Sequence, residues 1–410
     1  MSYGETVSTA HPVPAHVPPD LVYPLNVQTD PGFRSRPHER MAEIAKKYRI
    51  FYTPYAAGMK AEGSWFVTRN EDIRAILQDP DTFRSGGARP QGEMLGDKWV
   101  LIPVDLDPPR HGAFRTIMNP LFSPTRMKVL EEKVIERAAE FVERQAGKTG
   151  CEFISEFARP YPVSIFLEMM GLPVEETATF VKWEEMIVNS PEVSRRLEGT
   201  RLLRDYLRDI IAERRKNPTD DLISFAVTSQ VDGRPLTYDE IMGMCILLFM
   251  AGLDTVTSTL SFVFRYLGEN PQEQAKLRAD LRLLPDAIEE LLRAFAVVTT
   301  RRTVARDTEL CGTLVKAGET VVCPTAMASR DPEEFENPDQ VILDRSPNRH
   351  SAFGFGPHRC IGSHLARREL VAGTGEWLKR LPPFRLADGA AARVVGSGVL
   401  GVEKLQLVWD

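Results

Sequence analysis

Cysteine is scarce in this chain, and none of it falls in a Cys-x-x-Cys pair. The five cysteines form an odd-numbered, scattered set: Cys151, Cys245, Cys311, Cys323 and Cys360. A disulfide-built domain would show an even set, so the sequence indicates a reducing compartment and predicts a cytoplasmic protein. Internal repeats and low-complexity tracts are also missing, which excludes repeat and fibrous architectures.

Long apolar runs and basic clusters are absent as well. The longest apolar run, residues 241–252, is too short to cross a bilayer and indicates a buried helix segment. The first residues lack a charged start followed by an apolar stretch, so we expect neither a signal peptide nor a membrane anchor. A formal net charge of -6 without a basic run argues against a nucleic-acid partner.

What the chain does have is length and apolar content. It has 410 residues, 43% of them hydrophobic, which is enough for a large core. No linker divides it, and we expect a monomer with a single catalytic domain over residues 31–410. Residues 1–30 should form an extended arm, because proline recurs there and disfavours regular structure.

Local patterns place helices in the middle of the chain and strands towards its ends. Helical patterns dominate residues 110–268, and shorter ones cover residues 38–48 and 70–79, the latter with Asn70 as the expected N-cap. Strand patterns occupy residues 50–52, 63–68, 310–315 and 320–323. Residues 83–107 are rich in Gly, Pro and polar side chains, and a loop of that length in a compact protein is usually functional.

The most informative stretch is residues 353–362, Phe-Gly-Phe-Gly-Pro-His-Arg-Cys-Ile-Gly. Its glycines allow sharp bends and a close approach to a flat ligand. A helix is expected to begin at about Ile361, so its free N–H groups and positive dipole end lie beside the Cys360 sulfur and favour the thiolate. Such a thiolate can ligate haem iron axially, whereas a lone cysteine without these neighbours would be a buried structural residue.

The fixed positions of this stretch resemble the haem-binding loop of the cytochrome P450 superfamily. Within that superfamily the chain is most similar to the soluble bacterial camphor hydroxylases, over about residues 35–410. The resemblance implies a mainly α fold with a small β-rich lobe, and heme b (iron protoporphyrin IX) held between the long central helix and the helix after the cysteine loop. It assigns Cys360 as the axial ligand and places Phe353, Gly354 and Gly362 in the haem-binding loop.

A second signal lies within the long apolar helical pattern over residues 238–268. Gly252, Asp254 and Thr255 are poor choices for a buried helix interior, and an unpaired buried carboxylate is costly. They resemble the oxygen-activating kink of the P450 central helix, in which Gly252 makes room for dioxygen, Thr255 bonds the oxygen and Asp254 relays protons. The alternative is a threonine bonded back to its own helix and an aspartate that faces solvent.

Two charged sets accompany the cysteine loop. The segment Asp-Pro-Pro-Arg-His-Gly-Ala-Phe-Arg, residues 107–115, resembles a family motif that holds the haem carboxylates, and guanidinium groups suit carboxylates. The anchors implied by the resemblance are His111, Arg115, Arg302 and His358.

Glu290 and Arg293, at i and i+3 on one helix face, resemble the family's Glu-x-x-Arg pair, with Arg345 as a third partner. That trio is implied to brace the cysteine loop, although each residue alone would be an ordinary surface charge.

The resemblance also marks a substrate pocket. The positions that match pocket residues of the camphor hydroxylases are Trp99, Leu247, Met250, Val298 and Val399. Trp99 stands where a tyrosine hydroxyl holds the camphor ketone, and an indole offers only one N–H on a bulkier ring. We therefore expect a small, compact, apolar, monoterpenoid-like substrate in a pocket that departs from the camphor one. Trp99 as plain loop core is the alternative.

The activity implied by the resemblance is hydroxylation of an unactivated C–H bond with O2 and two electrons. No flavin or iron–sulfur motif occurs in the chain, so the electron donor is expected to be a [2Fe-2S] ferredoxin with an NAD(P)H-dependent reductase. Ferredoxins are acidic, and we expect Arg110 and Arg359 to belong to their docking patch. Two alternatives stay open: a peroxide-driven haem-thiolate peroxygenase, and a non-catalytic haem sensor.

Overall fold

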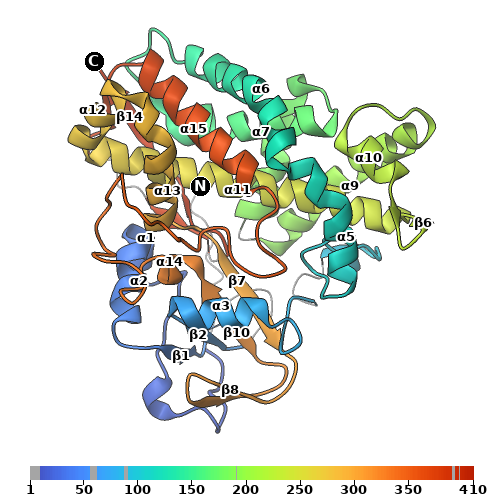
Figure 1. Cartoon of the computed structure of the whole chain (residues 1–410), viewed down its shortest axis with the longest axis vertical. Coiled ribbons are helices and arrows are strands. Elements are labelled where there is room, and N and C mark those ends of the chain that lie inside the picture. Colours follow the sequence, from blue (N-terminus) through green and yellow to red (C-terminus); the bar gives the residue numbers. More distant parts are fainter. Residues whose placement is uncertain (1–9, 56–61, 87–90, 191, 390–392, 397) are drawn as a thin grey trace.

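The computed structural model describes residues 10–55, 62–86, 91–190, 192–389, 393–396 and 398–410. Most of them belong to a helix-rich lobe, which fills the upper part of Figure 1, above a smaller lobe of sheet and short helices. The helices of the large lobe are α5 (Arg110–Met118), α6 (Pro124–Glu143), α7 (Pro160–Met170), α8 (Thr177–Glu184), α9 (Val193–Lys216), α10 (Leu222–Thr228), α11 (Tyr238–Glu269), α12 (Pro271–Ala279), α13 (Leu284–Ala294) and α15 (Ser363–Arg380). The prediction of a mainly α fold with a small β-rich lobe is confirmed.

The small lobe is built on a five-stranded sheet in the order β1-β2-β10-β7-β3. These strands are β1 (Ile50–Thr53), β2 (Ser64–Val67), β3 (Phe83–Arg84), β7 (Thr299–Val304) and β10 (Thr320–Pro324). β2 and β10 run parallel, and the other neighbours run antiparallel. Trp65, Val67 and Val321 are fully buried within one apolar cluster, so the sheet has a core of its own.

Short helices and ribbons complete the fold. The short helices are α1 (Pro31–Ser35), α2 (Pro37–Ala45), α3 (Asn70–Gln78), α4 (Gln91–Met94) and α14 (Thr325–Ala328). The ribbons pair β5 (Gln230–Val231) with β6 (Arg234–Pro235), β8 (Thr308–Leu310) with β9 (Thr313–Val315), and β12 (Val394–Val395) with β13 (Gly401–Val402). A three-stranded ribbon has the order β11 (Phe384–Leu386), β14 (Gln406–Trp409), β4 (Gly150–Glu152).

Two local predictions need correction. The single strand expected over residues 310–315 is the β8–β9 hairpin, because Cys311 and Gly312 adopt φ values of 51° and 77° and turn the chain. Asn70 is not the N-cap of α3 but its first residue, and the Asp331 carboxylate accepts a hydrogen bond from its N–H at 2.7 Å. The capping group therefore comes from a distant part of the chain.

The described part of the predicted arm, residues 10–30, lies along the sheet. Val17 and Leu25 are buried, and Val22 forms a β-bridge with Tyr52. The position of this segment therefore comes from tertiary contacts rather than from local propensity. The predicted loop at residues 83–107 contains only β3 and α4 among its described residues, and residues 87–90 lie outside the described part.

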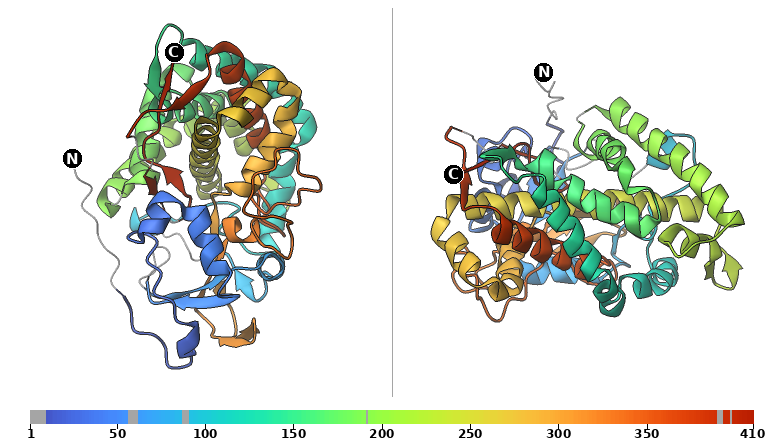
Figure 2. Two further views of the ribbon diagram at one scale, coloured as in Figure 1. Left: turned by 90° about the vertical axis from the view of Figure 1, so that its left-hand side faces the viewer. Right: turned by 90° about the horizontal axis from the view of Figure 1, so that it is seen from above.

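Helix α11 crosses the large lobe and is seen end-on, ringed by other helices, in the left view of Figure 2. A capping box starts it, in which Thr237 and Glu240 each accept a hydrogen bond from the other's N–H. The helix runs unbroken over Tyr238–Glu269, so the expected kink near Gly252 does not interrupt it. Among the described residues this one helix is long and apolar enough to span a membrane, and 67% of its most apolar window is buried against the rest of the fold.

Candidate active site

The loop that precedes α15 depends on two glycines. Gly354 and Gly356 adopt φ values of 66° and 68°, a region that other residues disfavour. A Cβ on Gly356 would also lie 2.2 Å from the Leu77 carbonyl oxygen, whereas a Cβ on Gly354 would meet nothing within 4 Å. Backbone geometry thus requires glycine at both positions, and at Gly356 close packing requires it too.

Cys360 stands immediately before α15. Its N–H donates to the Phe353 carbonyl at 2.9 Å, and the helix begins at Ser363, two residues later than predicted, with Gly362 at the N-cap position. The Cys360 side chain is exposed, yet protein surrounds it on most sides, and this desolvation raises the pKa of its thiol. The opposing effects come from the Gly362 N–H and from the charges of Arg115, Arg359 and Arg367. The helix start therefore acts in the predicted direction, but desolvation outweighs it.

One stripe of the otherwise buried helix α11 is accessible. Ala251 and Gly252 are exposed and Leu248 and Thr255 are partly exposed, at the spacing of one helix face. A Cβ on Gly252 would meet nothing within 4 Å. Ile361, the neighbour of Cys360, packs against the same apolar cluster as Leu248. The cysteine loop and this part of α11 thus pack against one apolar cluster.

The two polar residues that the sequence analysis singled out on α11, Thr255 and Asp254, differ in their surroundings. The Thr255 hydroxyl donates to the Ala251 carbonyl at 3.0 Å, so the back-bond of the alternative interpretation is present. Asp254, however, does not face solvent: it is 6% exposed, and desolvation raises its pKa to about 6, against the opposing charge of Arg159. A carboxyl group whose pKa lies near neutrality is suited to accept and donate protons.

The residues predicted as haem anchors come together. The rings of His111 and His358 lie 4.1 Å apart, and Arg115 donates to the Arg359 carbonyl at 2.8 Å. Burial, reinforced by the charges of Arg115 and Arg302, lowers the pKa of His111 to about 4. The Nε2 atom of His111 is buried and has no hydrogen-bond partner among the described residues. Two arginines beside an unpartnered ring nitrogen suit an anionic ligand.

Glu290, Arg293 and Arg345 meet in a buried ion-pair network. Glu290 and Arg293 are fully buried, and two guanidinium nitrogens of Arg293 lie 2.8 and 2.9 Å from the Glu290 carboxylate. Arg345 Nε lies 3.0 Å from the same carboxylate. The remaining donors of Arg293 bind the carbonyls of Ser329, Pro338 and Gln340. The network therefore ties α13 to the segment that leads into the cysteine loop.

The neighbouring Glu289, which the sequence analysis did not single out, contacts that loop more directly. It accepts from Arg367 of α15 at 2.5 and 2.8 Å, and its Oε2 lies 2.9 Å from His350 Nε2. The Arg367 guanidinium in turn lies over the Phe353 ring, 4.4 Å from its centroid. Only its adjacency to Glu290 could have drawn attention to Glu289, because its partners lie far along the chain.

The predicted pocket residues pack against two apolar clusters. Trp99 belongs to the cluster against which Leu247 and Met250 pack, while Val298 and Val399 form a β-bridge and pack against the other. Trp99 is 3% exposed and its N–H donates to Asp97 at 3.0 Å. That N–H is therefore already occupied, and the ring can offer a substrate only apolar contact.

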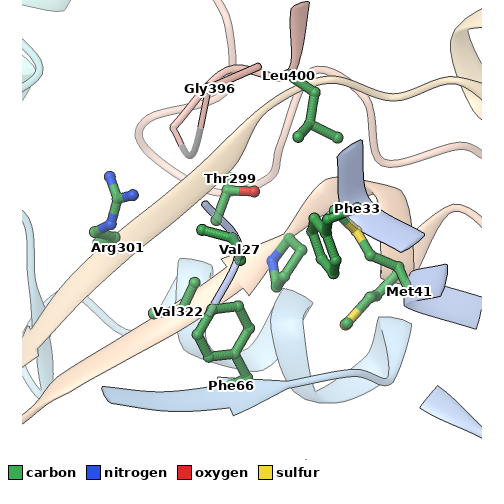
Figure 3. A pocket seen from close by; sticks show the side chains of 11 residues that line it. Val27, Phe33, Met41, Phe66, Thr299, Arg301, Val322, Gly396 and Leu400 are labelled. Atoms are coloured by element: carbon green, nitrogen blue, oxygen red, sulfur yellow. The ribbon is translucent and has the colours of Figure 1, made fainter. Parts of the chain in front are cut away.

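A separate apolar cavity, shown in Figure 3, lies beside β7 and the N-terminal helices. It is lined by Val27, Phe33, Met41, Phe66, Thr299, Arg301, Val322, Pro324, Met327, Gly396 and Leu400. None of these is a predicted site residue. Thr299 and Leu400 directly follow Val298 and Val399 in the sequence, so this cavity adjoins the β-bridge without including it.

Comparisons with known proteins agree with this geometry. The family described as "Cytochrome P450" matches residues 18–382. The chain is a cytochrome P450. This P450 is 38% identical to "Probable cytochrome P450 127A1" of Sinorhizobium fredii, over 97% of each chain. It also resembles the crystal structure of CYP101J2, with a TM-score of 0.86 and 32% identity over 97% of this chain and 99% of that one. For CYP101C1 the TM-score is 0.87, with 31% identity over 97% and 100% of the two chains.

The predicted family, enzyme class and cofactor are confirmed. Members of this family are oxidoreductases that incorporate molecular oxygen, and they hold a haem through an axial cysteine thiolate. The residues of this P450 fit that group. Cys360 is accessible at a helix start, His111 keeps a buried nitrogen unpartnered, and α11 presents an open stripe at Gly252.

Proposed function

We propose that this P450 hydroxylates an unactivated C–H bond of a small, apolar, monoterpenoid-like compound. The observation that carries the proposal is the open stripe of α11, which the partly exposed Leu247 widens because it lies one turn before Ala251, and Met250 is partly exposed as well. With its N–H occupied, Trp99 adds an apolar wall, and a wall without free polar groups favours an uncharged substrate. We assign Val298 and Val399 to the same pocket, and we propose that the protein is a cytoplasmic monomer.

Each polar residue of the site has a role in this proposal. The haem, when bound, supplies the chemistry that activates dioxygen and oxidises the substrate. Cys360 Sγ would be its axial ligand within the loop of Phe353, Gly354 and Gly362, and its carboxylates would be held by His111, Arg115, Arg302 and His358. Thr255 presents its hydroxyl beside the open surface at Gly252, and Asp254 passes protons inward from its carboxyl oxygen. Glu290, Arg293 and Arg345 keep the loop in place.

A spectral screen of small terpenoids tests the substrate class. Compounds that fit should displace solvent from the haem and shift its Soret band towards the high-spin position. A Leu247→Trp variant should lose the shift because the larger ring fills the pocket. Leu314→Trp, at a position 44% exposed on β9, is the control and should retain it. A shift only with charged compounds, or an unchanged shift in Leu247→Trp, would contradict the proposal.

We also propose that the electrons come from a [2Fe-2S] ferredoxin with an NAD(P)H-dependent reductase. Arg359 is exposed beside Cys360, while Arg110 is 58% exposed and paired with Glu240 at 3.2 Å. Arg359→Glu should therefore slow reduction by an acidic ferredoxin at low salt, and Arg110→Glu should slow it less. Arg385→Glu, on the distant β11, is the matched control. Equal rates in all three variants would refute this docking surface.

The two alternatives differ in what drives turnover. A peroxygenase would not need a buried acid to supply protons, and a sensor would need no turnover at all. The burial of Asp254 supports the route through O2 and two electrons. Product formation with peroxide far above that with ferredoxin would favour the first alternative. Absence of product with every electron donor and substrate tried would favour the second.

A further inference from the structure

Glu184, at the end of α8, is a buried carboxyl group with no part in the site described so far. It is fully buried, and neither of its carboxyl oxygens has a hydrogen-bond partner among the described residues. Arg159 Nε lies 3.1 Å from its Oε2, within ion-pair range but without hydrogen-bond alignment. An ionised carboxylate in such surroundings is energetically costly. Glu184 is therefore expected either to be protonated or to be kept for a functional reason.

Two π-helical turns position this pair. One spans Ile154–Ala158 and ends just before Arg159, and the other, Glu185–Asn189, begins just after Glu184. Such turns are rare and frequently lie at functional sites. Arg159 also binds Glu185 at 2.5 Å, and the Glu185 side chain is 48% exposed. Arg159 therefore connects a carboxylate at the surface with one in the interior.

The same arginine acts on Asp254 of the active site. Thr257, three residues after Asp254 on α11, donates to the carbonyl of Ala158, the residue before Arg159, at 3.0 Å. Residues at i and i+3 share a helix face, so Asp254 lies on the side of α11 that meets Arg159. Desolvation raises the pKa of both carboxyl groups and the charge of Arg159 opposes this rise, while the Asp254 charge raises the pKa of Glu184 further. Charges on three elements thus act on Glu184: Arg159, Asp254 and Glu185.

Charge balance then fixes how many protons these groups hold. Two buried carboxylates beside one guanidinium carry a net negative charge when both are ionised, and a low-dielectric interior disfavours it. With one proton the three groups are neutral. Desolvation raises the pKa of Asp254 to about 6 and that of Glu184 to about 8, so at neutral pH the pair holds one proton.

We propose that Glu184, Arg159 and Asp254 form a unit that stores one proton next to the active site, with Glu184 as the residue that returns a proton to Asp254 during turnover. The proton leaves a Glu184 oxygen and arrives at an Asp254 oxygen, and no electrons move. Glu184 is left as a carboxylate beside Arg159 until solvent protonates it again. Glu184 is a positioning residue, since it acts through Asp254, and its role in turnover rests on the monooxygenase activity proposed above.

Infrared titration of the haem-loaded ferric protein from about pH 5 to about pH 9 tests the stored proton without any turnover. The protonated-carboxyl absorption that Glu184 and Asp254 contribute in the wild-type protein should be lost in two steps, which belong to the pair. Glu184→Gln should keep only the step at lower pH. Asp254→Asn should keep one step, moved below the upper wild-type step because the like charge is gone. Glu175→Gln, at an exposed position just before α8, is the control and should keep both steps.

Turnover provides the second readout. At neutral pH Glu184→Gln should form product about tenfold more slowly and with a larger solvent isotope effect, since general acids typically contribute at least this much. The deficit should shrink near pH 6, where Asp254 retains its own proton.

Identical titrations of Glu184→Gln and the wild type would overturn the proposal. If neither the wild type nor any variant hydroxylates a substrate, the proposed function is wrong. The infrared titration would still show whether Glu184 and Asp254 store a proton. If Glu184→Gln does not fold, the shifted step in Asp254→Asn decides it.

Discussion

Replacing Glu290 by Gln should destabilise this P450 far more than an ordinary change on a helix surface. The substitution keeps the shape of the side chain and removes its charge. Arg293, which is fully buried, would then lack the one carboxylate partner it has among the described residues and retain three backbone carbonyls. Arg345 would lose the same partner.

The magnitude follows from the burial of the pair. Removing one partner of a buried ion pair costs about 3–5 kcal/mol, because the other charge stays buried without compensation. That is a large share of the about 5–15 kcal/mol by which proteins of ordinary stability are folded. Equilibrium urea unfolding of the haem-loaded protein, followed by circular dichroism and by the Soret band, measures the loss.

A matched control is the pair formed by Arg385 and Asp388, which has the same i, i+3 spacing but lies on the surface, with Asp388 95% exposed. Asp388→Asn should leave the urea midpoint nearly unchanged, as exposed pairs generally contribute little. If Glu290→Gln lowered the free energy of unfolding by less than about 1 kcal/mol, it would behave like a surface pair. The account of a buried network that braces the cysteine loop would then be wrong.

Three further outcomes are expected. Gly356→Ala should reduce haem retention much more than Gly354→Ala, because only the first adds a Cβ against the Leu77 carbonyl; equal retention would contradict the packing argument. The folded protein binds a proton at Glu184 between about pH 4.5 and about pH 8 that the unfolded chain has released, so its stability should fall as pH rises through this window, and Glu184→Gln should flatten the dependence measured by urea unfolding at several pH values. Thr255→Ala should still consume NAD(P)H but release peroxide in place of product. If the variant forms as much product per NAD(P)H as the wild type, Thr255 has no part in proton delivery.

Sequence reasoning succeeded where the chemistry is contiguous in the chain. The cysteine loop and the central helix each show in a continuous stretch of sequence, and both lie where expected. The start of α15 was placed too early, because Gly362 occupies the N-cap position instead of joining the helix. The turn at Cys311 was missed, since a left-handed cysteine is unusual and Gly312 alone marks the hairpin.

The parts that escaped prediction depend on tertiary contacts. Arg159 directly precedes α7 and Glu184 ends α8, and neither looks unusual among the many charged residues of the chain. Their proposed role can be recognised only from the fold, in which α11 brings Asp254 near them. Trp99 is similar: its matching position predicted a pocket residue, but the sequence could not show that Asp97 takes its N–H.

The central claim is that Cys360 donates its sulfur to a haem iron, and one spectrum tests it. The purified holoprotein, reduced and treated with carbon monoxide, should absorb at the wavelength characteristic of thiolate-ligated haem, and Cys360→Ser should lose that band. A wild-type protein without the band, or a serine variant that keeps it, would contradict the account.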